Sequence, residues 1–249
     1  MERFVLKQKL LNTSITNMYL EEIIETIIDL IEKKQRSYIV AVNVDVIMKI
    51  EKDSYLKEIT DQADIVLVDG QPLVWISKYY KNPIKQKVSG SDLVPQLCEK
   101  ASTIGYSFYI LGGRKEIAER AKKNLELIYP TIKIVGSYAP PIGFENDKDE
   151  IERINAMITE SHPDILVVCF GCPKQERFIF ENYKKYDAKV SICAGATVDF
   201  LAGNIKRAPR WMSNHGLEWF YRFLQEPKRL FKRYFVEDMK ILRLVRKYR

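Results

Sequence analysis

Asp64-Ile65-Val66-Leu67-Val68-Asp69-Gly70 decides the fold class of this chain of 249 residues. Four consecutive apolar residues stand between two aspartates, so both faces of the extended segment that they form are apolar. A strand of this kind is typical of a parallel sheet that is covered by helices on both sides. The aspartate and the glycine that follow mark the carboxyl end of the strand.

The same kind of apolar run recurs along the chain, and segments with helical periodicity separate the runs. Strands are expected at 38–42, 64–68, 106–111, 132–135, 164–169 and 190–193. Amphipathic helices are expected at 18–33, 92–103, 114–129 and 148–160. We therefore predict an α/β fold, with a Rossmann-like, mostly parallel sheet and helices on both faces. This domain occupies residues 1–204, and residues 205–249 form a helical C-terminal appendage, which we call the tail.

The composition fits this division. With 46% hydrophobic residues, the chain can bury a full core without a disulfide or a metal. The net charge of +7 resides in the tail, which holds 13 Lys and Arg against 4 Asp and Glu, whereas the preceding residues hold 27 against 29. The sequence contains no run of 18 apolar residues, so no segment is expected to span a bilayer.

The four cysteines indicate a reduced, cytoplasmic protein, because each lies in an apolar context and the N-terminus lacks a signal-peptide pattern. Cys169 and Cys172 have the spacing of a redox or zinc pair. However, they close a strand-like run, no second pair follows, and His162 and His215 are the only histidines. A structural role is therefore favoured over a metal or redox site.

The carboxyl ends of the predicted strands carry glycines and polar residues. They are Asn43, Asp69-Gly70, Gly112-Gly113, Gly171 and Gly195. In open α/β sheets, ligands bind beyond these ends, where glycine lets the backbone approach and helix N-termini favour phosphate. We expect the functional site at this edge of the sheet. The loop at 139–144 could cover the same edge.

Asp69 is the strongest candidate for chemistry from the residues alone. Its carboxylate should lie at the lip of a buried strand, next to a glycine that adds no side-chain bulk, and there it could accept a proton. The alternative is that Asp69 caps a helix that starts near Gln71-Pro72, where Asp and Pro are favoured. The sequence leaves both readings open.

Two further segments have the composition of anion sites. Gly112-Gly113 follows an apolar strand and precedes Arg114 and Lys115, so it is either a phosphate cradle or a plain turn. Lys87-Val88-Ser89-Gly90-Ser91-Asp92 offers a cation and two hydroxyls ahead of a helix, or else an ordinary capped helix start. Neither a G-x-G-x-x-G nor a Walker pattern is present, which argues against a dinucleotide or kinase-type site.

Asp147-Lys148-Asp149 has the D-x-D form with which many sugar-nucleotide enzymes hold a divalent metal. It lies in an acidic stretch at the beginning of a predicted helix and away from any strand end, where carboxylates complement the helix dipole. The helix-start reading is favoured. A nucleotide diphosphate would then have to be neutralised by protein cations and backbone amides.

The tail is amphipathic. At about 100° per residue, an apolar face centred on Phe231 separates from a face of Lys and Arg, and only Leu244 falls on the wrong side. The apolar face includes Leu230, Tyr234, Phe235, Met239, Ile241, Leu242 and Val245. This composition is typical of a helix that lies in a membrane interface. Membrane contact is favoured over docking of the apolar face on the body, because Trp211, Trp219 and Phe220 add interface-type rings.

Several motifs, in order along nearly the whole chain, carry a family resemblance. They are Val68-Asp69-Gly70-Gln71-Pro72-Leu73-Val74-Trp75, Val88-Ser89-Gly90-Ser91-Asp92-Leu93, Phe170-Gly171-Cys172-Pro173-Lys174-Gln175-Glu176, Gly195-Ala196 with Asp199-Phe200 and Gly203, and Arg207-Ala208-Pro209-Arg210-Trp211 through Gly216-Leu217-Glu218-Trp219 to Glu226-Pro227, Arg229 and Arg233-Tyr234. With these motifs the chain resembles the bacterial WecG/TagA/CpsF glycosyltransferases.

The resemblance implies a metal-independent, inverting transfer of a hexose-type sugar, N-acetylmannosamine or a related one. The donor would be a UDP-sugar and the acceptor a saccharide linked to a polyprenyl diphosphate, in cell-surface polysaccharide or teichoic acid synthesis. The enzyme would act as a peripheral protein on the cytoplasmic face of the cell membrane. The sequence does not choose among the donor sugars that such enzymes use.

Residue roles follow from the resemblance position by position. Asp69 matches the proposed catalytic base, Gln175 matches a glutamine that helps to hold the donor or acceptor, and Asn43 and Asp199 match residues of the nucleotide site. Lys87 and the amides of Gly112-Gly113 would stabilise the departing UDP. The tail is implied to complete the active site, with Arg207, Arg210 and Arg229 as ligands of the donor or acceptor phosphates.

Two departures from the family pattern stand out. Ala41 occupies a position that often holds threonine, so a hydroxyl contact is missing there. Lys87 stands where an arginine often contacts the diphosphate, which keeps the charge but loses the bidentate geometry.

Two other function classes compete with this reading. A nucleotide-dependent oxidoreductase on a Rossmann core is disfavoured by the missing glycine motif. A membrane-binding or nucleic-acid-binding module without catalysis would leave the Gln175 and Asp199 motifs unexplained. We therefore expect an anionic membrane surface and no nucleic acid among the partners. Self-association stays open, because the apolar face of the tail could also join two copies of the chain.

Overall fold

The computed structural model describes residues 6–209, 211–212 and 216–249. Its centre is a sheet of six strands, all parallel, in the order β4-β3-β8-β7-β5-β6. The strands are β3 (Ser37–Val42), β4 (Ile65–Val68), β5 (Ser107–Gly112), β6 (Lys133–Tyr138), β7 (Ile165–Cys169) and β8 (Val190–Cys193). The predicted α/β class and the position of every predicted strand are confirmed, within three residues at each end.

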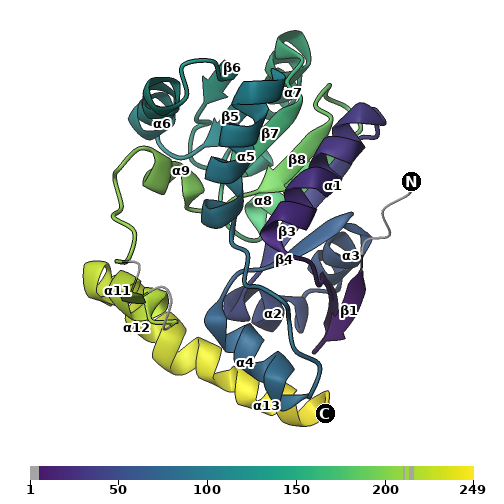
Figure 1. Cartoon of the computed structure of the whole chain (residues 1–249), viewed down its shortest axis with the longest axis vertical. Helices are drawn as coiled ribbons and strands as arrows, with labels where there is room; N and C mark the ends of the chain where they lie inside the picture. Colours follow the sequence, from purple (N-terminus) through teal and green to yellow (C-terminus); the bar gives the residue numbers. More distant parts are fainter. Residues whose placement is uncertain (1–5, 210, 213–215) are drawn as a thin grey trace.

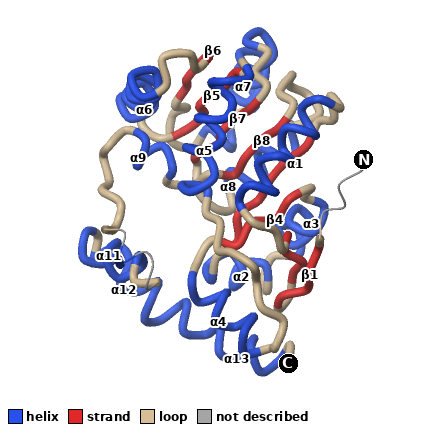
Figure 2. Tube along the Cα trace, viewed as in Figure 1, coloured by secondary structure: helices blue, strands red, loops and turns tan. Residues whose placement is uncertain are grey.

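Helices cover both faces of the sheet (Figures 1 and 2). Those of the α/β domain are α1 (Leu20–Glu32), α2 (Val44–Ile50), α3 (Ser54–Gln62), α4 (Gln71–Tyr79), α5 (Gly90–Ile104), α6 (Lys115–Ile128), α7 (Lys148–Ser161), α8 (Lys174–Asn182) and α9 (Thr197–Leu201). Residues of β7 alternate between the two hydrophobic clusters: Leu166 and Val168 pack on one face, Ile165 and Val167 on the other. This alternation is why the strands are apolar on both sides.

A hairpin of β1 (Lys7–Leu10) and β2 (Thr13–Thr16) protects the β4 edge of the sheet. The backbone N–H of Val66 donates to the Thr16 hydroxyl across 3.0 Å, which satisfies a donor that an edge strand would otherwise leave free. The sequence analysis did not predict this hairpin. Its strands are short and mostly polar, so the two-sided apolar pattern that revealed the others is missing.

The order of the strands brings together the loops that follow β3, β4 and β8, at the carboxyl ends of these strands. The chain leaves β3 toward β4 on one side, while β8 pairs with β3 on its other side. Loops that follow β3 and β8 therefore diverge, and this divergence opens a crevice at the carboxyl ends of neighbouring strands. The loop at 139–144 follows β6, the outermost strand on the side of the sheet away from β4, and Phe144 packs on Phe170, directly after β7, with ring centroids 4.5 Å apart. This loop therefore covers the carboxyl ends of β6 and β7 and lies away from β3 and β4.

The tail runs across the carboxyl ends of β3 and β4, and α13 lies beside α4 (Figure 1). Its elements are α11 (Glu218–Gln225), α12 (Pro227–Lys232), a π-helical turn η2 (Arg233–Glu237), a 3-10 turn η3 (Asp238–Lys240) and α13 (Ile241–Lys247). No helix in the described ranges is long and apolar enough to cross a membrane.

The apolar face of the tail is divided between two environments, and only its docking on the body is seen in the structure. Ile241 and Leu244 are buried in the core cluster that also contains β3 and β4, so one stripe docks on the body. Other side chains remain exposed: Phe231, Phe235, Met239 and Leu242. The helical projection grouped these stripes and misplaced Leu244, because the π-helical and 3-10 turns break the regular rotation of about 100° per residue.

Candidate active site

A cavity of about 830 Å³ lies beyond the carboxyl ends of β3, β4 and β8, between the α/β domain and the tail. Asn43 and Asp69 enter it from the loops after β3 and β4, and Thr197 enters it from the loop after β8. Arg222 and Arg233 enter it from the tail. The volume is in the range that small-molecule and cofactor sites usually have. The predicted edge of the sheet therefore carries a partly enclosed site, and the tail forms one of its walls.

Asp69 follows β4 directly, and its backbone N–H donates to the carbonyl of Val42 across 2.8 Å. The helix that follows is capped by Gly70, with no side-chain hydrogen bond at its N-terminus. The reading of Asp69 as a helix cap is therefore wrong, and its carboxylate faces the cavity. Burial raises its pKa, and Asp92 and Glu218 act in the same direction, while Lys87 and Arg222 oppose them.

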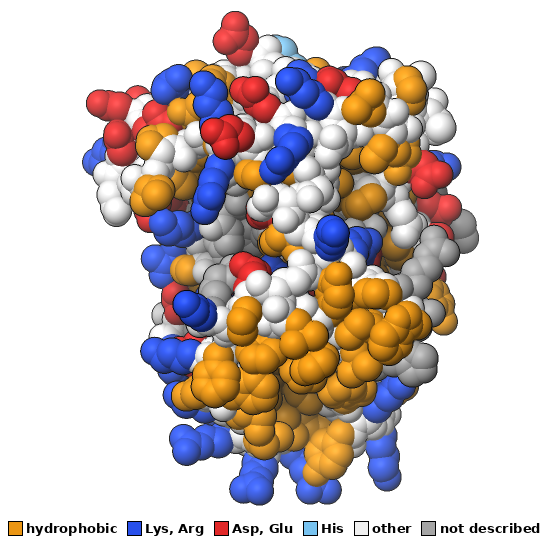
Figure 3. Space-filling view, turned by 90° about the vertical axis from the view of Figure 1, so that its left-hand side faces the viewer, with side chains coloured by type: hydrophobic (Ala, Val, Ile, Leu, Met, Phe, Trp, Pro, Cys, Tyr) orange, Lys and Arg blue, Asp and Glu red, His pale blue; other side chains and the backbone are white. Residues whose placement is uncertain are grey.

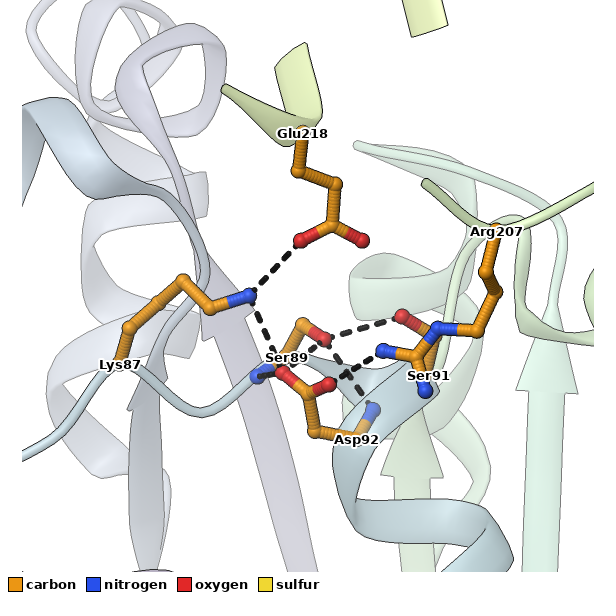
Figure 4. A network of polar contacts seen from close by, with 6 residues as sticks. All are labelled: Lys87, Ser89, Ser91, Asp92, Arg207 and Glu218. Atoms are coloured by element: carbon orange, nitrogen blue, oxygen red, sulfur yellow. Dashed lines mark hydrogen bonds and ion pairs between the residues drawn. The ribbon is translucent and has the colours of Figure 1, made fainter. Parts of the chain in front are cut away.

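Lys87 lies beside Asp69 in the cavity and belongs to a network of charges (Figure 4). Its Nζ is 3.2 Å from Oδ2 of Asp92 and donates to Oε2 of Glu218 across 3.0 Å. Burial lowers the pKa of Lys87, but Asp92, Glu218 and Asp69 outweigh burial and raise it. Lys87 is therefore held in its charged form at the centre of the site.

The start of α5 forms part of the cavity wall. Ser89 caps this helix by accepting from the backbone N–H of Asp92, and the Asp92 carboxylate accepts from the backbone N–H of Ser89. The capped-start reading of this segment is thus confirmed. Ser89, Gly90 and Ser91 also line the cavity, so the positive end of the helix dipole lies at the site.

Asn43 connects the body to the tail. Its Oδ1 caps α2 by accepting from the backbone N–H of Val46 across 3.1 Å, and it also accepts from Nη2 of Arg233 across 3.4 Å. The same guanidinium lies 3.8 Å from Oδ2 of Asp45 and 3.9 Å from Oδ2 of Asp238. Arg233 is therefore held over the end of β3, although it belongs to the tail.

The lining of the cavity is positively charged. Among the described residues it contains five cations against three carboxylates. The cations are Lys87, Lys206, Arg222, Arg233 and Arg246, and the carboxylates are Asp69, Glu218 and Asp238. A surplus of two charges in a partly enclosed space favours anionic ligands, because the low local dielectric strengthens the attraction.

Gln175 lies in the first turn of α8 and Asp199 in the first turn of α9, and neither is among the described lining residues of the cavity. Gln175 is buried, and its Oε1 accepts from the backbone N–H groups of Gly171 and Gly195, across 3.2 and 3.0 Å. It thereby ties the loop after β7 to the loop after β8. Asp199 begins α9 and accepts from Nδ2 of Asn204. These contacts show how both residues shape the rim of the site.

Gly112 and Gly113 also fall outside the described lining. A Cβ on Gly112 would lie 2.7 Å from the carbonyl oxygen of Cys169, and its φ of 113° is rarely adopted by other residues. A Cβ on Gly113 would lie 3.0 Å from Val198. Gly112 therefore permits a close approach to the end of β7, and Gly113 permits close packing on α9.

Of the three predicted tail arginines, only Arg207 can be placed in full. Its guanidinium pairs with Asp92 and so joins the network of Lys87 (Figure 4). Arg210 and the side chain of Arg229 lie outside the described residues.

The sequence analysis missed Glu218, Arg222, Arg233 and Asp238 as site residues. One signal for the two acids was present. The tail contains 13 Lys and Arg residues but only four Asp and Glu residues. Two of these four, Glu218 and Asp238, line the cavity. Acidic residues that occur in a strongly basic segment are candidates for specific ion pairs with particular cations.

The motifs with a possible metal role have structural functions. Asp147 caps α7 by accepting from the backbone N–H groups of Asp149 and Glu150, which confirms the helix-start reading. Cys169 and Cys172 are free thiols. Within the described ranges, His, Cys, Asp and Glu side chains form no group of three or more that could hold a metal ion.

Comparison with known proteins agrees with this geometry. The chain is 30% identical over 199 residues, 80% of its own length and 75% of the relative's, to an N-acetylglucosaminyldiphosphoundecaprenol N-acetyl-beta-D-mannosaminyltransferase of Bacillus subtilis (strain 168). A protein of the same name from Bacillus spizizenii (strain ATCC 23059 / NRRL B-14472 / W23) is 28% identical over the same shares. The model of the glycosyl transferase WecG/TagA/CpsF family matches residues 8–249. The chain therefore belongs to the WecG/TagA/CpsF family of glycosyl transferases.

Proposed function

We propose that this glycosyltransferase moves N-acetylmannosamine or a related hexose from a UDP-sugar to a saccharide linked to a polyprenyl diphosphate, with inversion at the anomeric carbon. The observation that carries the proposal is that Asp69 and Lys87 line the same cavity, whose described lining has surplus positive charge. A carboxylate that can accept a proton and a fixed cation are the two groups that a single displacement from a nucleotide sugar needs.

The reaction would proceed in one step. The acceptor hydroxyl attacks the anomeric carbon from the face opposite UDP, its proton passes to the Asp69 carboxylate, and the bond between the sugar and the β-phosphate oxygen breaks. The raised pKa of Asp69 suits it to take up this proton. General base catalysis by a positioned side chain contributes roughly 100- to 10,000-fold in rate.

The negative charge that develops on UDP would be stabilised by the cations of the cavity. Among the charged groups, Lys87 has the largest effect on the pKa of Asp69, which it lowers, and Arg222 and Arg233 approach from the tail. The N-terminus of α5 adds backbone N–H groups and the positive end of its dipole. Asn43, Gln175 and Asp199 shape the neighbouring rim, where we place the nucleoside.

We further propose that no divalent metal is required, because the protein's own cations can neutralise the leaving diphosphate. The test is turnover in excess EDTA, and we expect it to be unchanged. A strict requirement for Mg²⁺ or Mn²⁺ would contradict this part of the proposal and return attention to Asp147 and Asp149.

The exposed apolar surface of the tail supports peripheral binding to the cytoplasmic face of an anionic membrane. Hydrophobic side chains gather over the lower half of one face of the molecule, with Lys and Arg along its lower rim (Figure 3). The exposed large hydrophobic side chains of α4 and the tail, which we call the apolar band, are Trp75, Tyr79, Trp211, Phe220, Leu224, Phe231, Phe235, Val236, Met239 and Leu242. Large rings beside cations are typical of surfaces that enter a membrane interface.

Vesicle flotation of the chain cut before Ile205 tests the membrane proposal. The shortened protein should float less than the full chain on vesicles that contain anionic lipid. Equal flotation of both proteins would show that the tail does not supply the membrane contact.

The donor and the acceptor are best identified by a screen of UDP-sugars against a short-chain polyprenyl-diphosphate-linked saccharide. The names of the two Bacillus relatives favour a mannosaminyl donor and an N-acetylglucosaminyl acceptor, as in teichoic acid synthesis. The alternative is a nucleotide-binding peripheral protein without catalysis. It predicts binding of UDP and no transfer with any donor, whereas our proposal predicts transfer that depends on Asp69.

A further inference from the structure

The cavity has two ends with different chemistry. The polar end contains Asp69, Lys87 and the capped start of α5. The other end is formed by large apolar side chains of α4 and of the tail. They are Trp75, Ile76, Tyr79, Phe235, Met239, Leu242 and Val245. A nucleotide sugar has no part that matches this second end, because its nucleoside, diphosphate and sugar are all polar.

The walls of the apolar end are anchored to the core of the protein. Ile241 and Leu244 of α13 are buried in the core cluster, and Ile76 and Val245 pack against the same cluster. The hydroxyl of Tyr80, just after α4, donates to the carbonyl of Val245 across 2.8 Å. Two elements far apart in sequence are thus joined side by side, and the groove between them is a built feature of the fold (Figure 1).

The apolar end opens onto the apolar band. Trp75, Tyr79, Met239 and Leu242 line the cavity, yet they keep 50, 55, 55 and 57% of their surface exposed. Each of these side chains therefore contributes to the wall of the groove and to the outer surface. These side chains therefore connect the lining of the cavity to the part of the molecule that we expect to meet the membrane.

Cations lie along this path. Arg233 is held by Asn43 and Asp45 over the end of β3, on the same tail segment as Phe235, and Arg246 lines the cavity next to Val245. A ligand that occupies both ends would therefore carry a polar group first, then an anionic group, then an apolar chain. A saccharide joined through a diphosphate to an isoprenoid has this order.

We propose that the groove between α4 and the tail is a subsite for the first isoprene units of the lipid acceptor. The proposal rests on the proposed function, since it assumes that the acceptor hydroxyl lies at Asp69. It adds that the enzyme recognises the chain itself, so the apolar residues of the groove do more than attach the protein to a membrane. A groove that binds the chain would draw the acceptor from the bilayer while its diphosphate stays beside Arg233.

The test uses the full chain without vesicles or detergent, so that membrane attachment has no influence. Titration calorimetry measures the Kd of methyl, dimethylallyl and geranyl diphosphate. We expect at least about 10-fold tighter binding of geranyl than of methyl diphosphate, because a pocket for hydrocarbon commonly gives such a factor even for one methylene group. Equal Kd values for all three probes would overturn the proposal.

Matched variants separate the groove from the apolar band. Trp75→Ala and Leu242→Ala change exposed residues that line the groove, whereas Leu224→Ala and Phe231→Ala change exposed residues of the band that do not line it. The first pair should weaken binding of geranyl diphosphate about 10-fold and leave methyl diphosphate unchanged. The second pair should leave both Kd values unchanged. Equal effects of the two pairs would contradict a specific groove.

Turnover distinguishes a failure of this proposal from a failure of the proposed function. Suppose that sugar is transferred to acceptors of any chain length and that all three diphosphates bind equally. This result would contradict the proposed prenyl subsite and would leave the proposed function intact. Tight and groove-dependent binding of geranyl diphosphate without transfer from any UDP-sugar would remove the function and keep a prenyl-diphosphate site. Binding of UDP checks that each variant is folded.

Discussion

Asp69 and Lys87 form the centre of the site at the scale of single residues. The sequence placed both at the correct edge of the sheet, because each follows a recognisable strand or precedes a recognisable helix. It left open whether Asp69 is a base or a helix cap. Because Gly70 occupies the N-cap position of α4, Asp69 is not the cap. The choice depended on the direction of one side chain, which no periodicity encodes.

Replacement of Asp69 by Asn tests the base. Asp69→Asn keeps the size of the side chain and removes its ability to accept a proton. We expect transfer to fall by roughly 100- to 10,000-fold while the Kd of UDP stays nearly the same. Turnover assays and titration calorimetry with UDP check the two parts. Full activity of this variant would remove Asp69 from the mechanism.

The pH profile of the unchanged enzyme gives a second readout of the same residue. A base works only when it is ionised, so kcat/KM should fall as the pH drops through the pKa of Asp69. Because burial raises this pKa, the acid limb should lie above the usual range of an aspartate. An acid limb at or below that range would contradict the environment described for Asp69.

Glu218 is predicted to compete with the donor for Lys87. Its carboxylate accepts from Nζ of Lys87 across 3.0 Å, where we place the diphosphate. Glu218→Gln should therefore tighten the binding of UDP by about 2- to 5-fold, the factor that corresponds to a partly exposed ion pair. Glu237→Gln is the matched control, because Glu237 lies in the tail and pairs with Lys232 outside the described lining. Weaker UDP binding by the Glu218 variant would show that Glu218 supports the site instead.

At the scale of helices and strands, the prediction succeeded where a local pattern reports burial. The two-sided apolar runs gave the central strands, and the helices at 114–129 and 148–160 end within one residue of their predicted bounds. The β1–β2 hairpin was missed because its short strands have no such pattern. The rotation of the tail was only partly correct, since the π-helical turn Arg233–Glu237 shifts the face that follows it.

The tail residues of the site could not be found in this way for another reason. Glu218, Arg222 and Arg233 reach the cavity only because the tail packs across the ends of β3 and β4. Sequence periodicity describes one helix at a time, and it does not tell which other element that helix will contact. Asn43 was found because it directly follows β3, and Lys87 was found because it lies just before α5. Both positions are recognisable from local sequence patterns.

The close approach between the ends of β5 and β7 can be tested by substitution of Gly112. Gly112→Ala would place a Cβ 2.7 Å from the carbonyl oxygen of Cys169, whereas Gly143→Ala, at a φ of 92°, would meet nothing within 4 Å. Both variants are strained by positive φ, by about 1 to 2 kcal/mol. Gly112→Ala should lose a further 1 to 3 kcal/mol or so from overpacking. Urea denaturation measures both free energies of unfolding, and equal losses would contradict the tight approach of β5 and β7.

At the scale of the whole molecule, one face combines the mouth of the cavity with the apolar band and the basic rim (Figure 3). Under the proposed function, this arrangement would bring a water-soluble donor and a lipid-linked acceptor to the same residue from two directions. The uneven charge of the sequence anticipated it, since the tail has a surplus of positive charge and the residues before it have none.

Membrane contact should depend on the apolar band even where it does not line the cavity. The double variant Leu224→Ser and Phe231→Ser removes two exposed apolar side chains. We expect at least about 10-fold weaker binding to anionic vesicles, because each such side chain contributes roughly 1.5 to 3 kcal/mol when it is fully buried. Flotation measures the binding, and the Kd of UDP serves as the control for folding. Unchanged flotation would place the contact on another surface.

The central claim is that the donor binds with its diphosphate beside Lys87 and its sugar beside Asp69, under the tail. A crystal structure of the full chain with UDP tests it most directly. We predict the β-phosphate within hydrogen-bonding distance of Lys87, in the position that the Glu218 carboxylate occupies in the free protein. UDP bound at another edge of the sheet, with the pair of Lys87 and Glu218 intact, would contradict the account.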